Sequence, residues 1–211
     1  TKLPTVAHEI GQWPIYVDWN DELPRYTGVL RPYNLEHYAN IARKKGTEKY
    51  WAKWSEASAR LNRLMYKDEV ESFMRTPSCA GLQLLGAQDF TGQFEAMIGW
   101  RDSFYNIKPS VRTLPSFKSV FNSLPHLARF KKYIWTVGET YKAELILRNI
   151  TEECIPAGTE FKYSFASGDL EYSSHVLRLS KDIAPGEVAS VGVASIPLTP
   201  KTAGKKLVLK F

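Results

Sequence analysis

The spacing of apolar residues changes near residue 110, and this change limits the folds that the chain can adopt. Before this point, apolar residues recur every three or four positions in residues 34–45 and 47–75, as in helices that bury one face. After it, apolar and polar residues alternate in several short segments, as in strands that bury one face. We therefore predict two domains, residues 1–110 and residues 111–211.

Two short apolar runs in the first half, residues 5–10 and 80–90, each end in polar residues. Nearly continuous apolar character is typical of strands that are buried on both faces of a parallel sheet. The predicted helices 34–45 and 47–75 lie between the two runs, and the spacing predicts another helix over residues 93–105. This order of strand, helices, strand and helix indicates a β/α unit in which the two strands are parallel neighbours.

The second half contains four segments in which apolar residues alternate with polar ones. These segments are residues 141–149, 158–167, 187–196 and 205–211. Turn sequences that contain glycine separate them, among them Pro185-Gly186 and Ala203-Gly204. Several short alternating strands joined by turns predict an antiparallel β-sandwich.

Composition excludes several classes of protein. The 211 residues are 44% hydrophobic, which is enough apolar material for one large or two small domains. No stretch approaches the ~20 apolar residues of a transmembrane helix, so we expect no membrane span. The net charge is +6, but Lys and Arg are scattered, so we expect no nucleic-acid partner. Cys79 and Cys154 lie far apart without metal-ligand spacing, and we expect neither a metal nor a cofactor.

Polar residues that follow the two predicted strands are the candidates for chemistry. Glu9 ends the first run, within HEIGQW of residues 8–13, and Gln88 and Asp89 end the second. In a (β/α)8 barrel the active site lies at the carboxyl ends of the strands, so we expect these side chains at one rim. His-Glu also begins the HExxH zinc motif, but Gln12 stands where the second His is needed, which argues against a zinc site.

Three longer segments carry a resemblance to a known family. HEIGQWPIYVDWNDELPRYTGVLRP (8–32) and GLQLLGAQDFTGQ (81–93) resemble the end of the catalytic barrel in glycoside hydrolase family 2, the bacterial β-galactosidase, β-glucuronidase and β-mannosidase group. LARFKKYIWTVGETYKAELILRN (127–149) resembles the immunoglobulin-like domain that follows that barrel. The resemblance implies an α/β plus all-β fold: a helix-rich remnant of a (β/α)8 barrel, then an antiparallel immunoglobulin-like β-sandwich.

The resemblance also implies an activity and a set of site residues. It implies a retaining glycoside hydrolase that acts on an oligo- or polysaccharide, in the periplasm or outside a bacterial cell. The family nucleophile is a Glu at the end of barrel strand seven, and the resemblance places Glu9 in that role. The residues that it implies near the sugar are His8, Gln12, Trp13, Gln88 and Asp89.

Each of these residues also has a purely structural interpretation. Glu9 can cap a helix or pair with a Lys or Arg. His8 can be a structural histidine that makes its hydrogen bonds within the protein, and Trp13 can belong to the core. Gln88 and Asp89 can satisfy backbone amides of their loop. The sequence leaves both interpretations open.

A retaining glycosidase needs a second carboxyl group, about 5–5.5 Å from the first. In the family that residue belongs to an Asn-Glu pair, which this sequence lacks. The acidic residues that follow the motif, Asp18, Asp21 and Glu22, are expected in a solvated loop. A whole barrel needs about 250 residues. We therefore expect a carboxy-terminal piece of a larger enzyme, inert alone and prone to associate through strands 5–10 and 80–87.

Two other functions stay open on the sequence alone. One is a module that binds carbohydrate without catalysis. The other is a scaffold whose barrel remnant has lost its chemistry.

Overall fold

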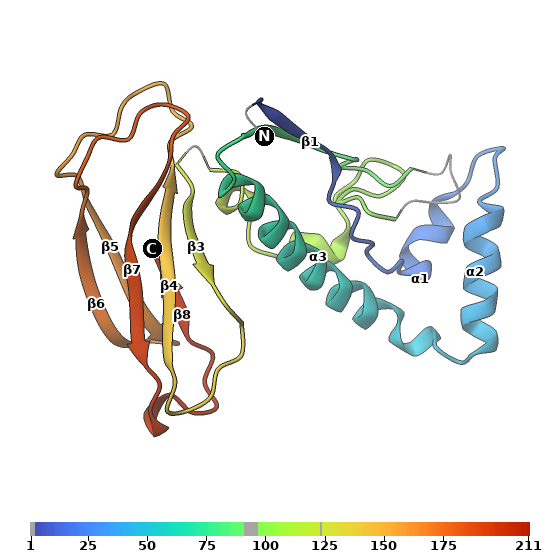
Figure 1. Ribbon diagram of the computed structural model, residues 1–211. Coiled ribbons are helices and arrows are strands. Elements are labelled where there is room, and N and C mark those ends of the chain that lie inside the picture. The colour runs from blue at the N-terminus through green and yellow to red at the C-terminus, as the bar shows by residue number, and fades with distance from the viewer. Residues whose placement is uncertain (1–2, 91–96, 123) are drawn as a thin grey trace. The chain divides into compact units, whose positions relative to one another are not determined.

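The computed structural model describes residues 3–90, 97–122 and 124–211, and it divides into two compact units. The first unit comprises Thr1–Val70 and Cys79–Val120, and the second comprises Glu71–Ser78 and Phe121–Phe211. Helices dominate the secondary structure of the first unit and antiparallel strands that of the second (Figure 1). The predicted change from helical to strand structure along the chain is therefore confirmed.

Up to residue 120 the chain forms mainly helices, with two short strands. In chain order these are β1 (Thr5–Ile10), α1 (Trp19–Glu22), the 3-10 helix η1 (Leu23–Arg25), α2 (Tyr33–Lys44), η2 (Glu48–Tyr50), α3 (Trp51–Met74), β2 (Cys79–Leu84), α4 (Pro109–Arg112) and η3 (Phe117–Ser119). The helices predicted over residues 34–45 and 47–75 correspond to α2 and to η2 with α3. No described helix is long and apolar enough to cross a membrane.

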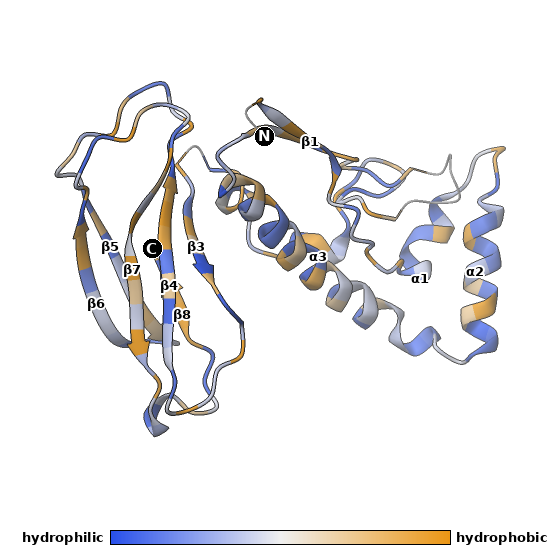
Figure 2. Ribbon diagram, in the orientation of Figure 1, coloured by the Kyte–Doolittle hydropathy of each residue, from blue (hydrophilic) through white to orange (hydrophobic). Residues whose placement is uncertain are grey.

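An apolar stripe on α2 holds it in the first unit. Leu35, Ala39 and Ala42 recur at three- and four-residue steps and are buried. They pack against Trp19 of α1 and Trp51 of α3 in one cluster. Figure 2 shows the resulting alternation of apolar and polar residues along α2.

β1 and β2 form a two-stranded parallel sheet, as the order of elements predicted. The prediction that both strands are buried on both faces is wrong. Val6 is 53% exposed, and in β2 only Cys79 is buried. The reason is that the sheet has only these two strands among the described residues, so each strand has an unpaired edge that water can reach.

The helix predicted over residues 93–105 is not present in residues 97–105, and residues 93–96 lie outside the described residues. Instead, residues 97–108 form an irregular loop whose backbone bonds to residues 87–89. Arg101 N–H donates to the Ala87 carbonyl at 2.9 Å, and Asp89 N–H donates to the Arg101 carbonyl at 2.9 Å. Gly99 lies so close to the Asp89 backbone that a side chain there would overlap it. These non-local bonds outweigh the local helical spacing.

The second unit consists of two three-stranded antiparallel sheets. Its elements are β3 (His126–Phe130), β4 (Thr140–Arg148), β5 (Glu160–Ser167), β6 (Leu170–Arg178), β7 (Val188–Pro197), η4 (Pro200–Thr202) and β8 (Val208–Lys210). The strand orders are β3-β4-β7 and β6-β5-β8. Side chains of both sheets share one core, in which Leu145 and Ala194 of the first sheet meet Phe165 of the second. The four predicted strands correspond to β4, β5, β7 and β8; β3 and β6 were not predicted.

Candidate functional site

β1 ends in a β-bulge at Glu9. Ala7 pairs with Leu82 of β2. The next pair joins Ile10 to Leu84, so β1 has two residues between its paired positions where β2 has one. A bulge of this kind bends the strand and redirects its side chains, and bulges are common beside active sites.

The backbone of Glu9 lies in the left-handed region, with φ of 56°. That conformation costs a residue other than glycine about 1–2 kcal/mol, so the surrounding structure must hold it. The Gln12 side-chain amide donates to the Glu9 carbonyl at 3.0 Å. Strained backbone of this kind clusters at functional sites. The side chains of His8, Glu9 and Gln12 are all exposed, so the bulge presents a carboxylate, an imidazole and an amide to solvent.

α3 anchors the chain directly after the bulge. One Glu69 carboxylate oxygen accepts the Gly11 N–H at 3.1 Å and the Trp13 indole N–H at 2.9 Å. The Tyr66 hydroxyl donates to the Gly11 carbonyl at 2.8 Å, and the Asn62 amide donates to the Trp13 carbonyl at 2.5 Å. Burial raises the pKa of Tyr66 to about 12, so its hydroxyl stays protonated and keeps donating. Trp13 is half-buried, and its indole N–H serves this anchor.

Gln88 and Asp89 follow β2 at the edge of the sheet where β1 also ends, because the strands are parallel. The Gln88 amide donates to the Ser103 carbonyl at 3.3 Å. Asp89 is 3% exposed and does not face solvent. It accepts the Gly99 N–H at 2.8 Å and the Lys108 ammonium at 2.7 and 2.8 Å. Gln88 and Asp89 thus hold the 97–108 loop in place, as their structural interpretation expects.

Asp89 belongs to a set of buried or half-buried ionisable groups that we call the charge cluster. Its members come from α1, η1, the loop after β2 and the 97–108 loop, and they are Glu22, Arg25, Asp89, Asp102 and Lys108. Arg25 donates to Asp102 at 2.6 Å and lies 3.8 Å from the Glu22 carboxylate. Asp102 is 1% exposed. Three buried carboxyl groups therefore share two cations, the buried Lys108 and the partly exposed Arg25.

Burial and the neighbouring carboxylates Asp102 and Asp89 raise the pKa of Glu22 to about 7, and Arg25 only partly opposes this. Burial also raises the pKa of Asp89 and lowers the pKa of Lys108, while the contact between the two opposes both shifts. The prediction of a solvated loop at residues 18–22 is therefore wrong for Glu22. A local signal existed: Glu22 follows the buried Trp19 by three positions, on the same face of α1.

From the raised pKa of Glu22 we predict how the stability of the fold depends on pH. The folded state holds this proton more tightly than the unfolded state, so ionisation of Glu22 opposes folding. Its contribution to the free energy of unfolding should fall by about 3 kcal/mol as pH rises from 4.5 to 7, and then level off. Glu22→Gln cannot ionise and should lose this slope. Urea unfolding followed across this pH range checks it, and parallel curves for the two proteins would contradict it.

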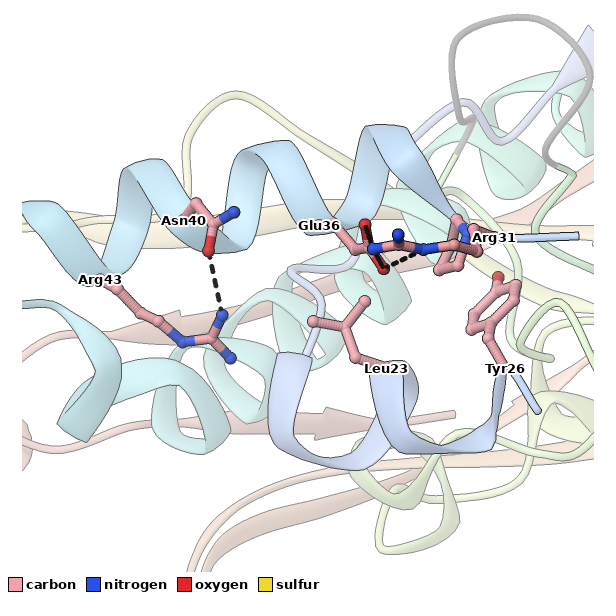
Figure 3. Close-up of a pocket in the computed structure, with 7 residues that line it drawn as sticks. Leu23, Tyr26, Arg31, Glu36, Asn40 and Arg43 are labelled. Atoms are coloured by element: carbon pink, nitrogen blue, oxygen red, sulfur yellow. Dashed lines mark hydrogen bonds and ion pairs between the residues drawn. The ribbon is translucent and has the colours of Figure 1, made fainter.

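A pocket with a volume of about 560 Å³ lies along α2. Its lining residues are Leu23, Tyr26, Arg31, Pro32, Glu36, Asn40 and Arg43. Figure 3 shows Leu23 and Tyr26 facing the polar side chains of α2. Arg31 pairs with Glu36 at 2.7 Å and Arg43 bonds to Asn40 at 3.3 Å, so the charged groups of the wall already have partners. Nothing in this pocket points to a particular ligand.

The described residues contain no group of three or more His, Cys, Asp or Glu side chains placed to hold a metal ion. In comparisons with known proteins, no protein-family model matches the chain and no curated protein is significantly similar to it. The site is therefore interpreted from its own geometry. The exposed groups at the bulge can act on a ligand, whereas the charge cluster is closed to one and supports the loop beside it.

Proposed function

We propose that the chain is the carboxy-terminal part of a retaining glycoside hydrolase related to family 2, with Glu9 as the nucleophile. One observation carries the proposal. An exposed carboxylate sits in a strained bulge at the carboxyl end of a strand, next to a parallel strand that ends at the same edge. Barrel enzymes place their catalytic residues at this position.

The proposal gives each unit a place in the parent enzyme. β1 and β2 are the last two strands of a (β/α)8 barrel, and α2 and α3 belong to the connection between them. The two packed sheets of the second unit are the immunoglobulin-like domain that follows the barrel. Other barrel strands then pair with the outer edges of β1 and β2, and the outer helices and interior side chains of the barrel cover their faces. Without them, the exposed edges favour self-association of the chain, which light scattering would detect.

The chemistry divides between Glu9 and a second carboxyl group on another barrel strand. A Glu9 carboxylate oxygen attacks the anomeric carbon while the bond to the leaving oxygen breaks and the second carboxyl group protonates that oxygen. Water then cleaves the glycosyl ester and its proton returns to the second group. His8 and Gln12 flank the carboxylate and can bond to sugar hydroxyls. The chain alone lacks this second carboxyl group, which acts as the general acid. General acid catalysis contributes about 10²–10⁴-fold to the rate, so we expect no turnover from the chain alone.

Trapping of the covalent intermediate in the longer parent protein tests the proposal. An activated 2-deoxy-2-fluoro glycoside should label the parent, and mass spectrometry should place the sugar on the peptide that contains Glu9. Glu9→Gln should abolish both labelling and hydrolysis while the fold persists. Glu56→Gln is the matched control, since Glu56 lies on α3, where it pairs with Arg60 at 2.6 Å, and it should keep full activity.

Two results would overturn this assignment. One is a Glu9→Gln parent with near-normal hydrolysis, and the other is a label on a different carboxylate. Glycan binding by the 211-residue chain, combined with an active Glu9→Gln parent, would instead support a non-catalytic carbohydrate-binding role.

A further inference from the structure

One end of the second unit gathers exposed apolar and basic side chains from two loops. The loops are the β3–β4 connection, residues 131–139, and the β7–β8 connection, residues 198–207. Gly138 N–H donates to the Leu198 carbonyl at 2.8 Å and Leu198 N–H donates to the Glu139 carbonyl at 2.9 Å, so the loops lie side by side (Figure 1). We call this end the basic tip. Its exposed members are Lys131, Lys132, Tyr133, Ile134, Val137, Lys201, Lys205 and Lys206.

The apolar members of the basic tip are exposed. Ile134 is 86% exposed, Tyr133 76% and Val137 45%. Their loop is held firmly, because Thr136 N–H and the Lys132 ammonium both bond to the Glu139 carboxylate, at 2.6 and 2.7 Å. The fold therefore holds these side chains in water, where burying them elsewhere would lower the free energy.

Firm packing of the neighbouring residue explains why Ile134 points outward. The Trp135 ring packs against Tyr141 of β4 with ring centres 5.3 Å apart, and its indole N–H donates to the Lys132 carbonyl at 2.7 Å. Trp135 thus occupies the inward position of the loop. Ile134, the residue before Trp135, therefore lies on the outer side of the loop.

Lysines surround these apolar residues. The β5–β6 turn lies at the same end, because the end of β5 pairs with the start of β8. The basic tip thus has five lysines and, among the described residues near it, the acidic residues Glu139, Asp169 and Glu171. The Tyr172 hydroxyl donates to the Lys201 carbonyl at 3.2 Å, and the Lys205 ammonium lies 5.9 Å from the Tyr172 ring centre. These contacts fix the β7–β8 loop to Tyr172 of β6, and the tip keeps an excess of positive charge.

We propose that the basic tip docks on the surface of an anionic phospholipid bilayer. Ile134 and Tyr133 enter the boundary between headgroups and acyl chains, where an aliphatic side chain and an amphipathic ring are stable. The lysines around them attract the negatively charged headgroups. A polyanion without an apolar layer, such as an acidic polysaccharide, would use the lysines but gain nothing from Ile134. The bilayer is the partner that uses both features.

Cosedimentation of the 211-residue chain with vesicles tests the proposal. Binding should occur with vesicles of phosphatidylcholine mixed with phosphatidylserine, and it should be weak with phosphatidylcholine alone and at high salt. Ile134→Ser with Tyr133→Ser should weaken binding about tenfold or more, and so should Lys205→Glu with Lys206→Glu. The matched controls change the same kinds of residue away from the tip. Ile150→Ser, and Lys162→Glu with Lys181→Glu, should bind as the wild type does.

Three outcomes would overturn the proposal. The first is no preference for anionic vesicles. The second is equal loss of binding in tip and control variants. The third is binding to an acidic polysaccharide that matches vesicle binding and is unaffected by Ile134→Ser, which would make the tip a polyanion site. Unchanged circular dichroism and sheet stability in the tip variants would separate lost docking from lost folding.

Discussion

Gly11→Ala is expected to destabilise the first unit by about 3–5 kcal/mol, because two costs combine at this position. Gly11 has φ of 80°, a conformation that an L side chain rarely adopts. An added Cβ would also overlap the ring of Tyr66, which is fully buried and bonds to the Gly11 carbonyl. Urea unfolding followed by tryptophan fluorescence would measure the loss, since five of the six tryptophans belong to the first unit.

Gly46→Ala separates the two costs. Gly46 has a similar φ of 67°, but a Cβ there would meet no atom within 4 Å. Its replacement should cost only about 1 kcal/mol, the backbone part alone. Equal losses at the two glycines would show that the contact with Tyr66 contributes nothing, and the account of the anchor after β1 would be wrong.

Lys108→Met is expected to cost about 3–5 kcal/mol, because it removes one partner of a buried ion pair. It leaves Glu22, Asp89 and Asp102 buried with Arg25 as the only cation of the charge cluster. Asp89→Asn should cost less, because it keeps the acceptor for the Gly99 N–H and leaves two carboxyl groups to balance Lys108 and Arg25. Lowering the pH should restore part of the stability of Lys108→Met, as the buried carboxylates take up protons.

A double-mutant cycle isolates the ion pair. Asp89→Asn with Lys108→Met should cost less than the two single changes together, with a coupling of about 1–3 kcal/mol. Glu56→Gln breaks an exposed ion pair on α3 and should cost under about 1 kcal/mol. Additive losses in the cycle would show that Asp89 and Lys108 are not coupled, contrary to their 2.7 Å contact.

Local periodicity was a good guide wherever one face of an element is buried. It located α2 and α3 in the first unit and β4, β5 and β7 in the second. It failed where the structure depends on distant residues. The loop around Gly99 and Asp102 has apolar spacing that suits a helix, but its bonds to residues 87–89 determine its shape.

The candidate site could likewise be predicted where it depends on local sequence, and not where it depends on distant residues. The position of Glu9 at a strand end, and the parallel neighbour beside it, could be read from the sequence. The bulge could not, because it depends on how residues far apart pair. The charge cluster was also missed, since Arg25 and Asp102 are separated by 77 positions and nothing near either residue indicates the partner.

The bulge at Glu9 amounts to one inserted residue. Leu82 and Leu84 are two apart in β2, so a chain with one residue fewer between Ala7 and Ile10 would pair over this segment in the same register without this bulge. A single-codon deletion could therefore leave the parallel sheet as it is and remove only the bent segment that presents the carboxylate. In evolutionary terms, the exposed carboxylate and the sheet that supports it are separable. A lineage could gain or lose the bulge and its carboxylate while it keeps the parallel sheet.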